Sequence, residues 1–284
     1  MENKEKWREV FAEKQLIRLQ QLEFIELQVI KKVCEQLSID FVLYGGTLLG
    51  AYKYQGFIPW DDDVDVALER ESYEKFIAEA PRLLPKDFVL QNLTIDSKSP
   101  YSYTKLRLKG TRCIEKNHAR LDIEQGVYVD IYPIDNIPDD NALYKRQFVK
   151  IQRLLWLIYL RQSGCNMNLS LGGLKLMVMH YGLRLTPIKY WMKKLKKEMT
   201  RYNEQKCNRK SCWHYPSSQN YYDPFLPLVT VNFNGEEFLA PNDMEAHLRR
   251  RYGNIDELPP MEKRIGHYIY KLDFGKFENE DPQW

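Results

Sequence analysis

The sequence predicts an α+β protein, in which a small mixed sheet packs against helices and is followed by a helical subdomain. Short runs of β-forming residues end at glycine or acidic residues, amphipathic runs with helical period separate them, and residues from about 141 read as consecutive helices. We expect a core over residues 1–140, a helical subdomain over residues 141–215, and a C-terminal segment over residues 216–284 that packs back on the core.

The first elements lead into the most informative part of the chain. Apolar residues recur at three- and four-residue intervals over residues 7–37, which predicts one or two amphipathic helices. Residues 41–44 read as a strand that stops at Gly45-Gly46, and residues 63–68 alternate acidic and apolar side chains with strand period. A loop with Gly56 and Pro59 lies between the two strands.

The later elements follow the same patterns. Asp140 is the expected cap of a helix that runs to about residue 162, Thr186-Pro187 the cap and first turn of another, and Gly253 the end of a third. The remaining expectations are helices over residues 72–80, 174–185 and 243–252 and strands over residues 104–108 and 127–132.

Composition excludes several classes of protein. The 284 residues are 44% hydrophobic and 29% charged, as in ordinary globular proteins, and a formal charge of +3 is too mild to indicate a nucleic-acid partner. The N-terminus lacks the apolar core of a signal peptide, and the uncharged apolar stretch over residues 154–160 is too short to span a bilayer, so we expect a cytoplasmic protein. Cys207, Cys212 and His214 are weighed as a zinc site against simple loop residues, but their spacing is wrong for a standard zinc knuckle.

The aspartates at residues 61–65 carry the chemical signal. Asp63 and Asp65 occupy alternate positions of a strand, about 6.6 Å apart on one face, and such a pair can bridge hard cations in phosphoryl transfer. With Asp61 and Asp62 beside them, repulsion among four carboxylates favours a bound cation. An EF-hand loop is excluded, because Val66 stands where glycine is required and Ser72 where glutamate is required. A solvated acidic turn is the remaining alternative.

Gly45-Gly46-Thr47 supplies the context for these aspartates. A glycine turn lets backbone amides and a hydroxyl approach phosphate oxygens closely. The order strand, glycine turn, helix and Asp-x-Asp strand matches enzymes of the nucleotidyltransferase fold, which add a third carboxylate from a nearby strand. Asp130 is the best-placed candidate for this role, and Asp122 and Asp135 are held in reserve.

The stretch from Gly45 to Lys53 and the stretch from Gly56 to Asp65 closely resemble the signature of the LicD-type family of phosphocholine transferases, which has fukutin-like relatives. Further matches are Lys105-Leu106-Arg107, residues 129–135, Tyr252-Gly253-Asn254, Leu258-Pro259-Pro260 and Lys263-Arg264. The resemblance implies a nucleotidyltransferase-type mixed sheet in a catalytic core over residues 1–140, with the helical subdomain over residues 141–215 facing the acceptor or a membrane. It also implies transfer of phosphocholine from CDP-choline to a sugar hydroxyl of a lipid-linked, cell-surface glycan precursor of the teichoic acid or lipopolysaccharide type, with Mg²⁺ or Mn²⁺.

Roles are carried over by position. Asp63 and Asp65 would hold the metals, and Asp130 would be the third ligand or the general base. Lys53 stands where the family usually has arginine, and Lys105 and Arg107 share one face of a strand that is either a phosphate clamp or a solvated edge. Donor- and phosphate-binding roles would fall to Gly45, Gly46, Thr47, Lys53, Lys105 and Arg107, and supporting roles to Asp61, Asp62, Trp60 and Arg264.

Several questions stay open at this level. A choline headgroup favours an aromatic cage, and tyrosines and a tryptophan lie near the motifs. The lysine-rich helix near Trp191 is either a solvated face or a peripheral membrane contact at the inner face of the membrane. Rival functions are transfer of phosphoribitol or another phosphopolyol from a CDP-linked donor, true nucleotidyl transfer, and a catalytically silent scaffold. The cage candidates are Tyr52, Tyr54, Trp60, Tyr101, Tyr103, Tyr128 and Tyr132.

Overall fold

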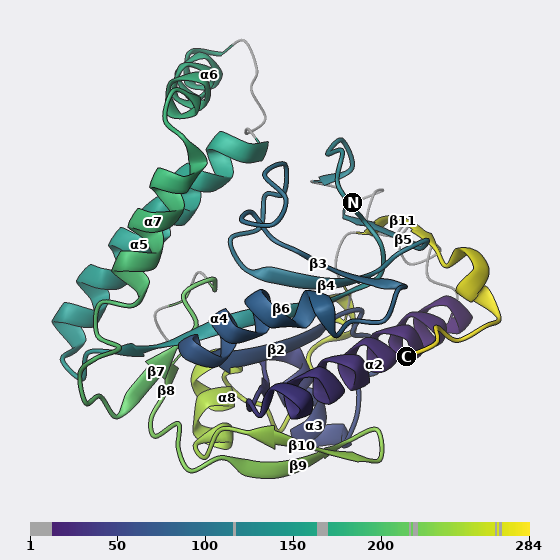
Figure 1. Ribbon diagram of the computed structural model, residues 1–284. Coiled ribbons are helices and arrows are strands. Elements are labelled where there is room, and N and C mark those ends of the chain that lie inside the picture. Colours follow the sequence, from purple (N-terminus) through teal and green to yellow (C-terminus); the bar gives the residue numbers. More distant parts are fainter. Residues whose placement is uncertain are drawn as a thin grey trace.

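The computed structural model describes residues 13–115, 118–163, 170–215, 217, 221–264, 266 and 269–284, and it confirms the α+β class (Figure 1). Within these residues, nine strands form one mixed sheet whose main path runs β3-β4-β6-β2-β1-β10-β9, with β7 and β8 attached to β6. β2 and β6 are parallel, as are β1 and β10, and the other pairs are antiparallel. Its strands are β1 Val42–Leu43, β2 Val64–Glu69, β3 Phe88–Gln91, β4 Thr104–Leu108, β6 Tyr128–Ile137, β7 Arg209–Ser211, β8 Tyr221–Tyr222, β9 Val229–Phe233 and β10 Glu236–Ala240. A separate pair joins β5 Arg112–Glu115 to β11 Ile269–Asp273.

The helices to which the sequence assigned bounds were predicted with small errors at their ends, whereas Gly45-Gly46, predicted as a turn, forms the first turn of the helix Gly45–Tyr54. The first predicted helix is a single helix among the described residues, and residues 7–12 of the predicted helix lie outside them. None of the described helices combines the length and the apolarity needed to cross a bilayer. The helices are α2 Glu13–Leu37, α3 Gly45–Tyr54, α4 Arg70–Glu79, α5 Asn141–Ser163, α6 Leu171–Arg184, α7 Ile188–Met199 and α8 Met244–Tyr252, with 3-10 turns at Ala80–Arg82, Met261–Lys263 and Gly275–Glu278.

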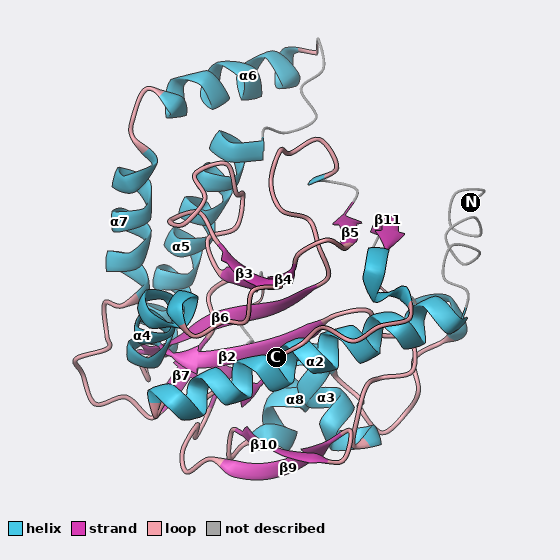
Figure 2. Ribbon diagram, turned by 45° about the vertical axis from the view of Figure 1, so that its right-hand side comes forward, coloured by secondary structure: helices cyan, strands magenta, loops and turns pink. Residues whose placement is uncertain are grey.

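α2 and α4 cover one face of the sheet, as Figure 2 shows for α2. The stripe of α2 that includes Leu22, Ile30 and Val33 is buried there, as its three- and four-residue spacing predicts. Tyr73 of α4 reaches the sheet and hydrogen-bonds Thr104 through the two hydroxyls at 2.8 Å. The opposite face of the central strands is therefore the one left to the predicted site.

The sequence analysis missed the β9–β10 hairpin. Its turn is Asn234-Gly235, and both residues have positive φ, 51° and 84°. Asn-Gly between two strands is the strongest local hairpin signal, so this pair could have been found. β10 then pairs in parallel with β1, which brings residues far along the chain into the main sheet.

α5, α6 and α7 form a helical arm that projects from the sheet (Figures 1 and 2). Asp140 caps α5 as predicted, because its Oδ1 accepts the N–H of Leu143 at 2.8 Å. Thr186 does not cap α7. Pro187 takes that position, and the Thr186 hydroxyl instead accepts from the indole N–H of Trp191 at 2.5 Å.

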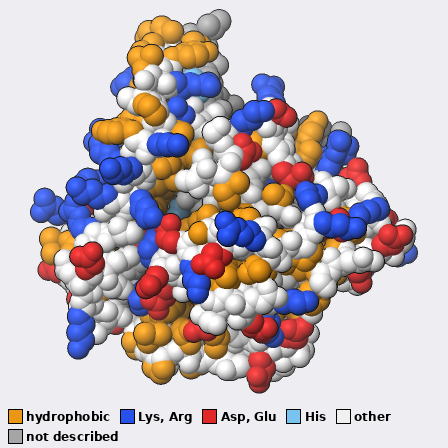
Figure 3. Space-filling model, viewed as in Figure 1, with side chains coloured by type: hydrophobic (Ala, Val, Ile, Leu, Met, Phe, Trp, Pro, Cys, Tyr) orange, Lys and Arg blue, Asp and Glu red, His pale blue; other side chains and the backbone are white. Residues whose placement is uncertain are grey.

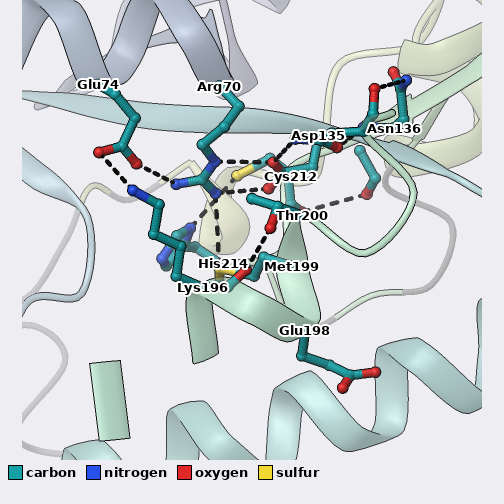
Figure 4. Close-up of polar contacts among 12 residues, drawn as sticks. Arg70, Glu74, Asp135, Asn136, Lys196, Glu198, Met199, Thr200, Cys212 and His214 are labelled. Carbon is teal, nitrogen blue, oxygen red and sulfur yellow. Dashed lines mark hydrogen bonds and ion pairs between the residues drawn. The ribbon is translucent and has the colours of Figure 1, made fainter. Parts of the chain in front are cut away.

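A polar network ties the arm to the core (Figure 4). Arg70 of α4 donates to both carboxylate oxygens of Asp135, at 2.8 Å and 2.6 Å. The side chain of Asp135 is fully buried, and that of Arg70 is 14% exposed. Glu74 links Arg70 to Lys196 of α7 by two ion pairs, at 3.4 Å and 2.9 Å. The buried pair and the surface pairs should differ in their contribution to stability.

We expect Arg70→Ala to lower the free energy of unfolding by about 3 kcal/mol, because it leaves the Asp135 carboxylate buried without its charge partner. Urea unfolding would measure the change. Lys196→Ala is the control, because its ion pair is exposed and should contribute less than about 1 kcal/mol. Equal losses of unfolding free energy in the two variants would show that the buried Arg70–Asp135 pair contributes no more than the exposed Lys196–Glu74 pair.

Candidate active site

Three strands bring two predicted carboxylates and a lysine into one row. Asp65 on β2 lies opposite Asp130 on β6, and Lys105 on β4 lies opposite Asp130 from the other side. Adjacent strands are about 4.8 Å apart, so side chains at one level of one face are neighbours. The side chain of Thr104 points toward α4. Because successive side chains of a strand point to opposite faces, the side chain of Lys105, and with it the whole row, lies on the face away from α4. We call Asp65, Asp130 and Lys105 the charged row.

Asp65 is fixed by hydrogen bonds, yet one of its oxygens is left over. The Tyr215 hydroxyl donates to Oδ2 at 2.5 Å, and the Asp65 N–H donates to the Thr47 hydroxyl at 2.8 Å. Among the described residues, Oδ1 is buried without a hydrogen-bond partner. Burial, and then the charges of Asp63 and Asp130, raises the pKa of Asp65 well above its usual value. A cation bound to this carboxylate would offset both the cost of burying its charge and the repulsion from Asp63 and Asp130.

Two glycines let the start of α3 approach these acids. Gly45 has a φ of +58°, and a Cβ there would collide with Oδ2 of Asp65. A Cβ on Gly46 would lie 2.8 Å from Oδ2 of Asp61. The positive end of the α3 dipole therefore faces carboxylates, which favours anions at this point. The glycines predicted to admit phosphate make room for the aspartates.

Asp61, Asp62 and Asp63 form an acidic loop directly before β2. Each offers a carboxylate oxygen, and the three oxygens lie within 4.8 Å of one another. Gln20 of α2 donates to the backbone carbonyl of Asp61 at 2.9 Å, and Gly266 leaves the space that the Asp62 carboxylate fills. The loop is thus held in place from two sides.

Glu23 on α2 is a buried acid near this loop that the sequence analysis missed. It is 1% exposed, and its Oε2 has no hydrogen-bond partner in the described part of the chain. Burial raises its pKa well above the usual value, and the charges of Asp63 and Asp62 raise the pKa further. An acidic residue next to Leu22 in the buried stripe of α2 was the available signal.

The oxygen donors at this site fit a hard divalent cation. The acidic loop supplies three closely spaced carboxylates, and Asp65 adds a buried oxygen without a partner among the described residues. Carboxylate oxygens are the ligands that Mg²⁺ and Mn²⁺ prefer. Asp63 and Asp65 belong to this donor set. Asp130 lies beside it, with Oδ1 2.8 Å from the Lys105 amine and Oδ2 accepting from the Tyr132 hydroxyl at 3.0 Å.

Lys105 is enclosed by protein groups. It is 1% exposed, its amine lies 3.4 Å from the ring centre of Tyr128, and Glu115 Oε2 is 3.9 Å away. The alternative of a solvated edge face is therefore excluded, because β4 lies between β3 and β6. The lysine instead compensates the charge of Asp130 and fixes that carboxylate.

Arg107 lies two residues after Lys105 on β4, so it shares the same face of the sheet, and it is also buried. Its Nε donates to Gln91 at 2.8 Å, its Nη1 to the carbonyl of Gly126 at 2.7 Å, and its Nη2 to the hydroxyl of Tyr101 at 3.4 Å. All three nitrogens thus bind protein acceptors. This arrangement orients β3 and β4, and a phosphate-clamping role for Arg107 stays a prediction.

Aromatic rings line the row on one side. The ring of Tyr132 lies 4.6 Å from that of Tyr103, 5.7 Å from Tyr44, 5.6 Å from Tyr215 and 5.9 Å from His214. We call these five residues the aromatic wall. Burial lowers the pKa of His214 to about 3, so its ring is neutral near pH 7. Of these five, the sequence named only Tyr103 and Tyr132 as cage candidates. Tyr215 and His214 come from distant positions, whereas Tyr44 directly precedes Gly45-Gly46, and that place was the available signal.

Arg251, at the C-terminal end of α8, brings a positive charge to the wall. Its guanidinium carbon lies 3.7 Å from the ring centre of Tyr215, and its charge lowers the pKa of Asp65. The residue directly precedes the Tyr252-Gly253 match, so its place in the sequence was the available signal. Its charge suits a phosphate group next to Asp65.

Other predicted residues lie away from the row. Lys53 donates to the carbonyl of Ile255 at the far end of α3, about 12 Å along the axis from Gly45. Tyr52 and Tyr54 are exposed near the same end. These three positions are not brought to the carboxylates.

The remaining candidates are also accounted for. Asp122 is exposed and pairs with Lys98 at 2.5 Å, so neither it nor Asp135, which binds Arg70, joins the row. Arg264 lies 5.3 Å from the ring centre of Trp60, at the start of the acidic loop.

The zinc site that was weighed against simple loop residues is not assembled within the described residues. Cys212 Sγ lies 3.9 Å from His214 Nδ1, but Cys207 does not complete a group of three ligands with them. The burial of Cys212 raises its pKa to about 12, which keeps the thiol protonated at neutral pH.

His247 gives the fold a measurable pH dependence. It is fully buried, its Nδ1 donates to the carbonyl of Tyr221 at 2.9 Å, and burial lowers its pKa to about 3. The unfolded side chain titrates near 6.5. The neutral, buried ring therefore stabilises the fold fully above pH 6.5, and this stabilisation is lost as the pH falls toward 3.

We expect His247→Gln to reduce the loss of unfolding free energy between pH 7 and pH 5 by about 2 kcal/mol. Urea titrations at both pH values test this, and an unchanged loss would contradict it.

Comparison with known proteins agrees with this geometry. Residues 38–154 match the family model described as LicD/FKTN/FKRP, nucleotidyltransferase domain, a range that includes α3, the acidic loop and the charged row. The lipopolysaccharide cholinephosphotransferase LicD of Haemophilus influenzae is 26% identical over 267 residues, which cover 90% of this chain and 95% of that protein. Both comparisons confirm the resemblance to the LicD type that the sequence indicates, and the family-model match places this resemblance in residues 38–154.

Proposed function

We propose that this protein transfers phosphocholine from CDP-choline to a sugar hydroxyl of a lipid-linked, cell-surface glycan precursor of the lipopolysaccharide or teichoic acid type, with Mg²⁺ or Mn²⁺ as cofactor. The observation that carries the proposal is the convergence of the charged row, the acidic loop and the start of α3 inside the matched domain. The activity by which the similar Haemophilus influenzae protein is named, lipopolysaccharide cholinephosphotransferase, supports the choice of phosphocholine.

The residues divide the work by their positions. The acidic loop and Asp65 would hold the cation, which when bound neutralises charge on the donor diphosphate. Arg251 would place the same diphosphate by its positive charge, and the start of α3 would position the carboxylates that hold the cation. Hydrogen bonds to Asp65 and to the backbone of the acidic loop keep these groups fixed before the donor binds.

Asp130 would receive the proton of the acceptor hydroxyl. Lys105 and Tyr132 fix its two oxygens, so the carboxylate is held ready as an acceptor. The hydroxyl oxygen forms a bond to the phosphorus of phosphocholine, the bond from that phosphorus to the oxygen of CMP breaks, and CMP leaves with the electron pair.

The aromatic wall suits the trimethylammonium group of choline. The rings of Tyr103 and Tyr215 pack against that of Tyr132, and the hydroxyls of Tyr132 and Tyr215 bind the Asp130 and Asp65 carboxylates. A quaternary cation is attracted both to aromatic rings and to carboxylates. A ribitol group has no such charge, so this wall favours choline over the phosphopolyol alternative.

The test uses purified protein with Mg²⁺ and, separately, CDP-choline, CDP-ribitol and CTP, with a glycan extract as acceptor. Release of CMP together with a phosphocholine mass increment on the acceptor supports the proposal. Preference for CDP-ribitol would move the protein to the rival donor, and pyrophosphate release from CTP would indicate nucleotidyl transfer. Failure to bind any of the three nucleotides would leave the scaffold function and refute the transferase.

A further inference from the structure

An apolar stripe is exposed along the whole of α6. Its members recur at intervals of three and four residues, and each is more than half exposed. Single exposed apolar side chains are common, but a contiguous exposed patch marks an interaction surface. At about 100° per residue they fall within about 80° of the helix circumference. They are Leu171 (90% exposed), Leu174 (54%), Val178 (67%), Tyr181 (61%) and Leu185 (87%).

The opposite side of α6 faces the rest of the arm. His180 is buried there, and its ring nitrogen bonds the carbonyl of Leu160 in α5 at 2.7 Å. Gly173 is also buried. The stripe therefore points away from the protein, and α6 lies at the outer end of the arm (Figures 1 and 2).

The charge of this region is one-sided. Residues 141–197 contain twelve lysines and arginines and no aspartate or glutamate. Because the whole chain carries +3, all other residues together carry −9. Lys175 and Arg184 flank the stripe on its two sides, and exposed lysines continue along α7, as the hydrophobic and basic side chains on the arm in Figure 3 show. The α7 lysines are Lys189, Lys193, Lys194, Lys196 and Lys197.

We propose that α6 lies in the interface of a bilayer with anionic headgroups, with its apolar stripe inserted among the acyl chains and the arm lysines on the headgroups. Exposed apolar side chains flanked by cations on one short helix are the signature of an interfacial helix. Anionic lipid attracts such a positive segment, while the negative remainder of the chain is repelled. A second copy of this chain is a poor occupant, since it would bring two strongly positive arms together.

Flotation with vesicles tests the docking surface. The full chain is mixed with vesicles of phosphatidylcholine alone or of phosphatidylcholine with phosphatidylglycerol, and the bound fraction is measured at low and high salt. We expect binding to the anionic vesicles that weakens with salt. Leu171→Gln, Leu174→Gln and Val178→Gln combined should weaken binding about tenfold or more. Lys193→Gln, Lys194→Gln and Lys197→Gln combined should remove the preference for anionic lipid.

A matched control replaces three exposed apolar residues elsewhere, Leu83→Gln, Ile95→Gln and Tyr270→Gln, and it should bind vesicles like the unmodified chain. Circular dichroism of each variant checks that the fold is retained. Absence of vesicle binding, equal loss in the control, or a dimer in light scattering that the α6 changes dissociate would overturn the proposal. The readout needs neither donor nor turnover, so its failure leaves the proposed transferase activity untouched.

Discussion

Asp65→Asn is expected to abolish transfer while making the metal-free protein more stable. The variant keeps an acceptor oxygen for the Tyr215 hydroxyl but removes the charge that would bind the cation, so turnover should fall about a thousandfold or more. The same change removes a buried charge that lies near Asp63 and Asp130, and it should raise the free energy of unfolding by about 2 kcal/mol in EDTA.

Two measurements on the same samples check this pair of effects. CMP release gives turnover, and urea unfolding with EDTA or with Mg²⁺ gives stability. Mg²⁺ should stabilise the unmodified protein and leave Asp65→Asn unchanged. Asp122→Asn is the control, because that carboxylate is exposed and should affect neither quantity. A variant that loses activity and stability together would show that Asp65 acts through the fold.

Gly45→Ala is expected to cause the second large effect. The residue has a φ of +58°, and a Cβ would collide with Oδ2 of Asp65, so either the start of α3 or the carboxylate must move. We expect a loss of about 3 kcal/mol in unfolding free energy. Turnover should fall about a hundredfold, because a displacement of an ångström at the reacting groups costs about that much.

Gly235→Ala separates the collision from the backbone conformation. Gly235 has a φ of +84°, but a Cβ there meets nothing within 4 Å. That variant should therefore show only the cost of positive φ, about 1 kcal/mol, with full activity. Equal effects at the two glycines would show that the approach of α3 to Asp65 is unimportant.

Local patterns predicted the elements that position the site. The alternation around Asp65 gave β2, the amphipathic period gave α2, and Asp140 marked the start of α5, since each signal is contained in neighbouring residues. The C-terminal strands were missed, because a strand such as β10 is defined by its pairing with β1 about 200 residues away. The Asn234-Gly235 turn was the local signal in the sequence for this strand.

The site was predictable where it is built from strands. Asp65 and Asp130 follow from strand period and a parallel register. Tyr215 was not predictable, because it reaches Asp65 from 150 residues along the chain and its segment has no regular pattern. Lys105 was found but its surroundings were not, because burial of a lysine depends on the tertiary charge of Asp130.

Titration calorimetry of CDP-choline tests the central claim most directly, since it needs no acceptor. The account predicts binding that requires Mg²⁺ or Mn²⁺, is lost in Asp65→Asn, and is unchanged in Asp122→Asn. Binding of equal strength in EDTA, or retained by Asp65→Asn, would contradict a donor site built on a cation held by these carboxylates.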